Sequence, residues 1–110
     1  MKNVKVAGAE YKIQVKELVD NDPNVYGSCV YHDAHIEIRK GLSKERAEQT
    51  LIHELLHATF FEAGYRGDEY EELVERLSVV LHQVIKENDL ARLLEQVAEQ
   101  GQKGSNINEI

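Results

Sequence analysis

The feature that most constrains the fold is a change in the spacing of apolar residues near Ser43. Before Ser43, apolar and polar residues alternate in short stretches, which is typical of strands buried on one face. After it, apolar residues recur every three or four positions, as they do along one side of a helix. The alternating residues are Val4, Val6, Tyr11, Ile13 and Val15, and the helical ones are Ala47, Leu51, Leu55, Ala58 and Phe61. The order of strands first and helices afterwards predicts an α+β protein.

Two pairs of strands are expected before this switch. The first is a hairpin that turns at residues 8–10. The segment 20–24 is dense in Asp, Asn and Pro, and predicts a loop. A second pair follows at residues 29–31 and 36–39, joined through residues 32–35. We therefore predict a small antiparallel sheet.

Three helices are expected after the switch. Ser43 is the predicted N-cap of the first, and Gly64 its end. A second helix is predicted from about residue 68 to about residue 88, antiparallel to the first because the connector is short. A third, over residues 90–100, is expected to close one side of the domain. The predicted apolar stripes are Leu73, Val74, Leu77, Leu81, Val84 and Ile85, then Leu90, Leu93, Leu94 and Val97.

The chain has 110 residues, which is enough for one core, and we expect a single domain over residues 1–100. Residues 101–110 are rich in Gly, Ser, Asn and Gln and are expected to form a flexible tail. The net charge of −7 argues against nucleic acid as a partner. The absence of a long apolar run and of a signal-like start predicts a cytoplasmic protein with no membrane contact.

The segment His53-Glu54-Leu55-Leu56-His57 carries the strongest chemical signal. Within a helix, His53 and His57 lie one turn apart on one face, so their imidazoles can bind one metal ion. Glu54 lies about 100° round the helix, where it can contact a water on that ion without binding the ion itself. Because Cys29 is the single cysteine, a cage of thiolates is excluded, and this residue is expected to be a buried free thiol. The pattern predicts a zinc site with Glu54 as a general base.

A catalytic zinc ion usually has three protein ligands, so a third is expected. The residue three positions after His57 is Phe60, which excludes the metzincin pattern. The second helix offers two acidic residues on one face, Glu71 and Glu75, one of which can be the third ligand. Folding the two helices about the midpoint of residues 64–68 places Glu75 level with His57. The two other acidic residues at this helix start, Glu69 and Glu72, are interpreted as solvated side chains.

The element Glu71-Glu72-Leu73-Val74-Glu75 resembles the second-helix element of thermolysin-like gluzincins. This resemblance implies that Glu71 binds zinc and that Glu75 orients a ligating histidine. The wider pattern, over residues 50–58, 71–77 and 83–88 with the strand pair before it, resembles small phage and prophage proteins of the ImmA/IrrE type. The resemblance spans roughly residues 25–90 and implies a minimal zincin fold. The chain departs from the larger members by lacking their extended part after the second helix.

These observations predict a zinc metallopeptidase that hydrolyses a peptide bond in a cytosolic protein, with Glu54 moving the proton. The resemblance implies a phage-type repressor or an antitoxin as substrate. An extended substrate is expected to pair with the sheet edge near residues 36–38. Four side chains are candidates to stabilise the oxyanion: Tyr31, His32, His35 and Tyr65. The alternative is a non-catalytic zinc-binding regulatory or interaction protein.

Two further residues are interpreted as structural. His82 follows Glu71 by eleven positions, which is about 16 Å along a helix axis, so it cannot share the same ion. Cys29 lies on a predicted buried strand, where a cysteine more often belongs to the core than acts as a nucleophile.

Overall fold

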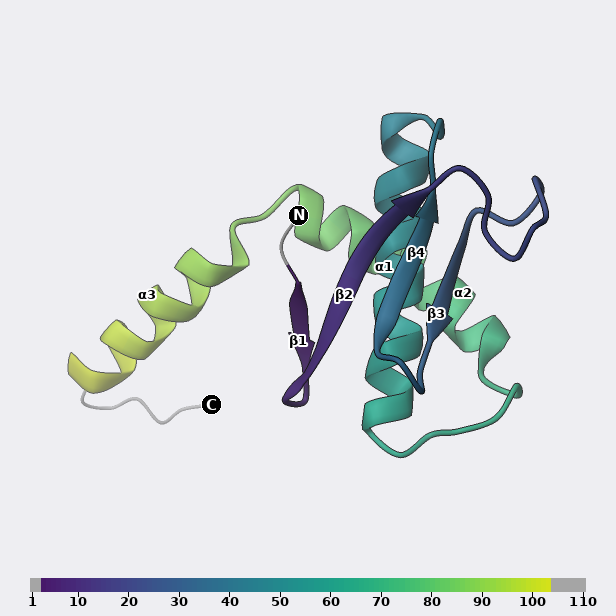
Figure 1. Cartoon of the computed structure of the whole chain (residues 1–110). Coiled ribbons are helices and arrows are strands. Elements are labelled where there is room, and N and C mark those ends of the chain that lie inside the picture. Colours follow the sequence, from purple (N-terminus) through teal and green to yellow (C-terminus); the bar gives the residue numbers. More distant parts are fainter. Residues whose placement is uncertain (1–2, 104–110) are drawn as a thin grey trace.

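The computed structural model describes residues 3–103, which form a four-stranded sheet and three helices (Figure 1). The strands are β1 (Val4–Val6), β2 (Ala9–Lys16), β3 (Gly27–Val30) and β4 (His35–Arg39). The helices are α1 (Lys44–Glu62), α2 (Glu71–Lys86) and α3 (Leu90–Lys103). The predicted α+β class is confirmed. Residues 101–103 of the predicted tail belong to α3, and residues 104–110 lie outside the described part of the chain.

The sheet is mixed, with the strand order β1-β2-β4-β3, so the prediction of a wholly antiparallel sheet was wrong. Its central strands β2 and β4 are parallel, with Ile13 opposite Ile36 and Val15 opposite Ile38. The connection of residues 17–26 brings the chain back as β3, antiparallel to β4 but one strand width away from β2. The turn after β3 then places β4 in that gap, parallel to β2. Alternation predicted the strands, but it could not predict this insertion.

Helix α1 has the two ends that the sequence predicted. At its start, the Ser43 hydroxyl oxygen accepts a hydrogen bond from the backbone N–H of Arg46 at 3.1 Å. At its end, Gly64 has a φ of 100°, a left-handed conformation that glycine adopts without strain. The next N–H, of Tyr65, donates to the carbonyl of Phe60 at 2.8 Å and closes the last turn.

Helix α1 covers one face of the sheet, and the core lies between them (Figure 1). Tyr11, Ile36 and Ala58 are fully buried there, and Ile38 nearly so. The Tyr11 hydroxyl also donates to a carboxylate oxygen of Glu62 at 2.8 Å, which links β2 to the end of α1. Burying one face of α1 against the sheet fixes the direction in which its other faces point.

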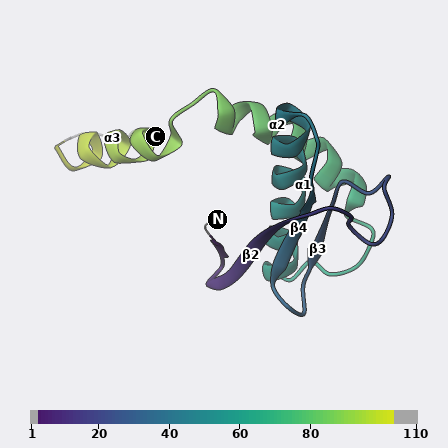
Figure 2. The ribbon, with the colours of Figure 1, turned by 45° about the horizontal axis from the view of Figure 1, so that its top comes forward.

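Helix α2 packs against α1 and crosses it (Figure 2). Val74 and Ser78 are buried in this contact, and the Gln49 amide donates to the Ser78 hydroxyl at 3.1 Å. Further along, Glu48 contacts His82 at 3.0 Å and Lys86 at 2.6 Å. The Lys86 ammonium, and then His82, lower the pKa of Glu48 to about 2. These polar contacts fix the rotation of α2.

The predicted apolar stripe of α2 does not face α1 as a whole, which corrects the sequence interpretation. Leu73, Leu77 and Ile85 are exposed, whereas Val74 is fully buried. The helix also begins at Glu71 and not near residue 68. The reason is that α2 turns its acidic start and Ser78 towards α1, so the polar contacts and the small residue determine which face is buried.

Helix α3 projects away from the rest of the molecule (Figures 1 and 2). Residues 90–102 are all exposed, so the prediction that this helix closes one side of the domain was wrong. A local cap starts it, because an Asp89 carboxylate oxygen accepts from the N–H of Arg92 at 3.2 Å. Capping and periodicity determine that a helix forms but not what it packs against. Within residues 3–103, none of the helices combines the length and apolarity that crossing a membrane requires.

Candidate metal centre

The two histidines of α1 point towards the same place. Their ring centroids are 4.9 Å apart, and the two Nε2 atoms are separated by 3.2 Å. Each side chain is about one fifth exposed, with values of 19% for His53 and 20% for His57. A spacing of four residues on a helix produces this arrangement, because it places the side chains one turn apart on one face.

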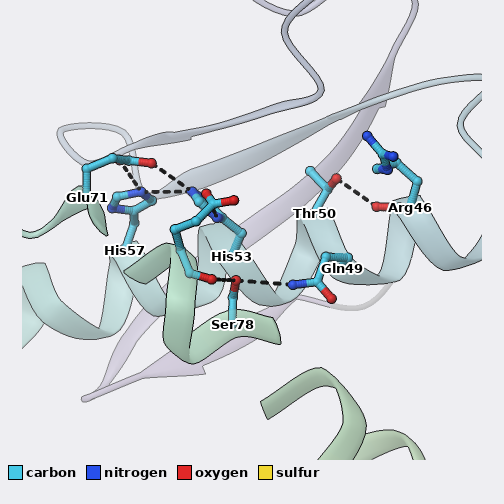
Figure 3. Close-up of polar contacts among 8 residues, drawn as sticks. Arg46, Gln49, Thr50, His53, His57, Glu71 and Ser78 are labelled. Carbon is cyan, nitrogen blue, oxygen red and sulfur yellow. Dashed lines mark hydrogen bonds and ion pairs between the residues drawn. The ribbon is translucent and has the colours of Figure 1, made fainter. Parts of the chain in front are cut away.

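Helix α2 brings a carboxylate to these rings (Figure 3). One oxygen of Glu71 lies 3.0 Å from Nε2 of His57, and the other lies 3.3 Å from Nε2 of His53. The three residues offer ligand atoms that all lie within 4.8 Å of one another. The structure therefore places a His-His-Glu group at the junction of α1 and α2.

Glu75 lies one turn further along α2, on the other side of His53. Its carboxylate oxygen is 3.5 Å from Nδ1 of His53, whereas Nε2 of the same ring faces Glu71. The simple hairpin geometry placed Glu75 level with His57. The structure differs because α2 begins at Glu71 and crosses α1, so its first residue reaches both imidazoles. Glu75 thus lies beside Nδ1 of His53, the ring nitrogen that does not face Glu71.

The donor set suits a divalent metal ion. Two imidazole nitrogens and one carboxylate are a known catalytic zinc set. Imidazole binds a metal in its neutral form, and burial, together with the charge of His53, lowers the pKa of His57 while Glu71 opposes the shift. The residues present therefore fit a bound cation, and the two imidazole nitrogens are close enough together to bind one ion.

Glu54 is buried beside this group, with 7% of its surface exposed. Burial raises the pKa of its carboxyl to about 7, and the negative charges of Glu71 and Asp20 add to the effect. A cation held by the neighbouring residues would act in the opposite direction. Glu54 is therefore a buried carboxyl group beside the three possible ligands, and its protonation depends on whether a cation is bound there.

An open cavity of about 690 Å³ gives access to the group from one side. Its walls come from the edge strand β3, the second half of α1 and the connector to α2. Two of the four proposed oxyanion donors, Tyr31 and Tyr65, line it. Burial raises the pKa of Tyr31 to about 12, so its hydroxyl keeps its proton and can donate. The ring of Tyr31 stacks on Phe61 at 4.3 Å, which fixes its position.

The two other proposed donors do not line this cavity. His32 is an exposed residue in the turn after β3. The ring of His35 is held between Asp33 at 3.0 Å and Glu37 at 2.8 Å, at the start of β4. The segment 36–38 is also not a sheet edge, because β4 lies between β2 and β3. The edge strand beside the site is β3, which corrects the predicted place for an extended substrate.

The two residues interpreted as structural occupy different surroundings. His82 contacts Glu48 and is not part of the His-His-Glu group. Cys29 lines the cavity, and burial, followed by the charge of Glu54, raises the pKa of its thiol to about 12. A thiol with so high a pKa is a poor nucleophile near neutral pH.

The sequence interpretation missed a second cavity, also of about 690 Å³, on the other side of His53 and Glu54. Tyr26, Arg46 and Gln49 line it, together with Gly27 and Glu75. A Cβ atom on Gly27 would lie 2.5 Å from the side chain of Thr50, so β3 approaches α1 closely at this point. A glycine two positions before a predicted strand was the available signal for such an approach.

Comparison with known proteins adds no family to these observations. No protein-family model matches the chain, and neither a curated protein nor a solved structure is significantly similar to it. The resemblance to gluzincins and to ImmA/IrrE-type proteins therefore stays a prediction.

Proposed function

We propose that this protein is a zinc-dependent peptidase that uses Glu54 to move a proton during hydrolysis of a peptide bond. The observation that carries the proposal is the meeting of His53, His57 and Glu71 beside a buried carboxyl at an open cavity. The three possible ligands come from two helices, α1 and α2, that pack against each other through the buried residues Val74 and Ser78.

Two imidazoles and Glu71 would hold the metal ion, with Glu75 orienting His53. When bound there, a zinc ion supplies Lewis-acid chemistry, lowering the pKa of a water molecule and polarising a carbonyl group. Glu54 accepts the proton from the attacking water and donates it to the amine that leaves. Tyr31 and Tyr65 line the same cavity, and in this proposal their hydroxyls donate hydrogen bonds to the oxygen that becomes negative.

The free edge of β3 suits an extended peptide as substrate. Only β4 pairs with this strand among the described residues, and β3 lines the cavity next to Glu54. Unpaired backbone groups of an edge strand can add a further strand by hydrogen bonding. A phage-type repressor or an antitoxin as the physiological substrate remains a prediction from resemblance.

Metal binding is tested first, by mass spectrometry of the purified protein and by titration calorimetry with zinc. We expect one zinc ion per chain, and at least about a 100-fold loss of affinity in His53→Ala, because a ligand contributes more than an orienting residue. The matched control is His82→Ala, which removes an imidazole outside the group and should leave zinc affinity unchanged. Equal zinc binding by both variants would contradict the site.

Catalysis is tested with casein and a fluorogenic peptide library as probes. Glu54→Gln should bind zinc like the wild type and cleave at least about 100-fold more slowly, because the general base is lost. If zinc-loaded wild-type protein cleaves neither probe, or if Glu54→Gln cleaves as well as the wild type, the catalytic proposal is wrong.

A zinc-binding interaction protein without catalysis is the second candidate. The observation that favours it is α3, whose exposed face carries Leu93, Leu94 and Val97 without an intramolecular partner among the described residues. Catalysis is supported better, because a structural zinc ion is normally enclosed by four protein ligands, and the group here offers three.

A further inference from the structure

The groove that runs past the candidate metal centre has two halves of different chemistry. Both cavities include His53, Glu54 and Glu71, so together they extend to either side of the centre. Strand β3 lies along this groove and follows the direction of α1. Near its start, Gly27 approaches Thr50, and just past its end Tyr31 stacks on Phe61. An extended peptide beside β3 would therefore occupy both halves.

The half at the C-terminal end of α1 is rich in aromatic side chains, and the charged residues Arg66 and Asp68 also line it. Five of the seven Tyr and Phe residues of the chain line it, namely Tyr31, Phe60, Phe61, Tyr65 and Tyr70. The rings of Phe60, Tyr65 and Tyr70 contact one another, with centroid distances of 5.9 Å from Phe60 to Tyr65, 5.8 Å from Phe60 to Tyr70 and 5.5 Å from Tyr65 to Tyr70. Tyr65 nevertheless keeps 55% of its surface exposed. Aromatic rings that are clustered but open to solvent gain stability when another large apolar side chain covers them.

The half at the N-terminal end of α1 carries a positively charged side chain, that of Arg46. The guanidinium of Arg46 lies over the ring of Tyr26 at 5.0 Å, and it has no ion pair with any carboxylate among residues 3–103. Of the three acidic residues of this half, Glu54 is buried, and Glu71 and Glu75 are turned towards the imidazoles. Arg46 stands seven residues before His53, about 10 Å along the helix axis. That distance corresponds to about three residues of an extended peptide.

We propose that the groove selects peptides with a large aromatic side chain on one side of the reacting bond and a carboxylate about three residues away on the other. This inference rests on the proposed function for the position of the bond, but the selectivity of binding can be measured separately. Phe60 and Tyr65 contact the aromatic side chain, and Arg46 pairs with the carboxylate. Arginine suits this role because its planar group binds a carboxylate through two hydrogen bonds.

The test uses zinc-loaded Glu54→Gln, which should bind substrates without cleaving them, and fluorescein-labelled ten-residue peptides. One peptide carries Phe at the centre and Asp three residues away, and it is made with both orders of the two residues. In two matched peptides Ala replaces Phe, or Asn replaces Asp. Fluorescence anisotropy should show that the full peptide, in one order, binds at least about tenfold more tightly than either matched peptide.

Two substitutions in this background assign the two halves. Adding Tyr65→Ala should remove most of the preference for Phe and keep the preference for Asp. Adding Arg46→Gln should do the reverse, and Arg92→Gln on the exposed helix α3 is the matched control that should change neither. Both tested side chains are exposed, and circular dichroism with thermal unfolding checks that the variants fold like the parent.

Equal affinity for all peptides, or equal loss of affinity in both variants for every peptide, would overturn the inference. Cleavage by the wild type separates this result from the proposed function. If the wild type cleaves all peptides equally well, the peptidase proposal stands and the selectivity is wrong. If the peptides bind with the expected preference but are never cleaved, the selectivity stands and the peptidase proposal is wrong.

Discussion

The close approach of β3 to α1 at Gly27 gives a prediction whose size can be worked from the structure. In Gly27→Ala, the new Cβ would lie 2.5 Å from Cγ2 of Thr50, 3.1 Å from the carbonyl oxygen of Glu37 and 3.3 Å from Cγ of Glu54. The first distance cannot be kept, because Thr50 is buried in a helix and its hydroxyl donates to the carbonyl of Arg46 at 2.7 Å. Strand and helix must therefore separate.

Overpacking of this kind costs about 1–3 kcal/mol in the free energy of unfolding. For a domain of this size, that cost lowers the midpoint of thermal unfolding by roughly 4–20 °C. Urea unfolding followed by circular dichroism measures the change, and an unaltered slope shows that the unfolded state is the same.

The control is a double-mutant cycle with Thr50→Ser, which removes Cγ2 but keeps the hydroxyl. Alone, Thr50→Ser should cost about 1 kcal/mol, because it removes one buried methyl group. In the double variant, the loss in free energy of unfolding should be at least about 1 kcal/mol smaller than the sum of the two single losses, because the shortest contact disappears. If the two substitutions add to within about 0.5 kcal/mol, the steric reasoning is refuted.

Three further predictions address the metal site, the ion pairs of Glu48 that join α1 to α2, and the packing of α2 and α3. Glu75→Gln should weaken zinc binding about 10–100-fold, and Glu71→Gln should weaken it more, because Glu71 is the proposed ligand and Glu75 the orienting residue. Titration calorimetry measures both, and the reverse order would mean that Glu75 is the ligand. Because the pKa of Glu48 is lowered to about 2 from an ordinary value of 4.5, its ion pairs stabilise the fold above about pH 4.5, and that contribution is lost as the pH falls towards 2. Glu48→Gln should therefore be less stable than the wild type in urea unfolding near pH 7 but not near pH 2, and a difference that persists at the lower pH would contradict this. Val74 is fully buried, so Val74→Ala should lower the free energy of unfolding by about 2–3 kcal/mol. Leu94 is 73% exposed, so Leu94→Ala should change it by less than about 0.5 kcal/mol. A large effect at Leu94 would show that α3 packs against other residues in solution.

The parts of the fold that were predictable depend on interactions between residues close in sequence. Helix α1 begins after the cap at Ser43 and ends before the left-handed Gly64, as the sequence predicted. The convergence of His53 and His57 likewise needs only a helix, because the spacing of four residues brings the rings together. These features were readable because hydrogen bonds and side-chain contacts within one helix do not depend on the rest of the chain.

The features that were wrongly predicted depend on which elements meet. Alternation in β2 and β4 showed that both are strands, but not that β4 would insert beside β2 and make the sheet mixed. The apolar stripes of α2 and α3 suggested burial, yet much of both is exposed. Amphipathic periodicity reports that a helix has an apolar face, and it carries no information about a partner for that face.

The sequence by itself determined an α+β chain with two imidazoles and a carboxyl group arranged on one helix, because local periodicity and spacing are sufficient for that. Only the tertiary structure decided that Glu71 is the acidic residue that meets both histidines, since this depends on where α2 begins and how it crosses α1. It also decided that the groove continues past the centre to Arg46. Contacts between distant segments are set by the packing of whole elements, which no local pattern encodes.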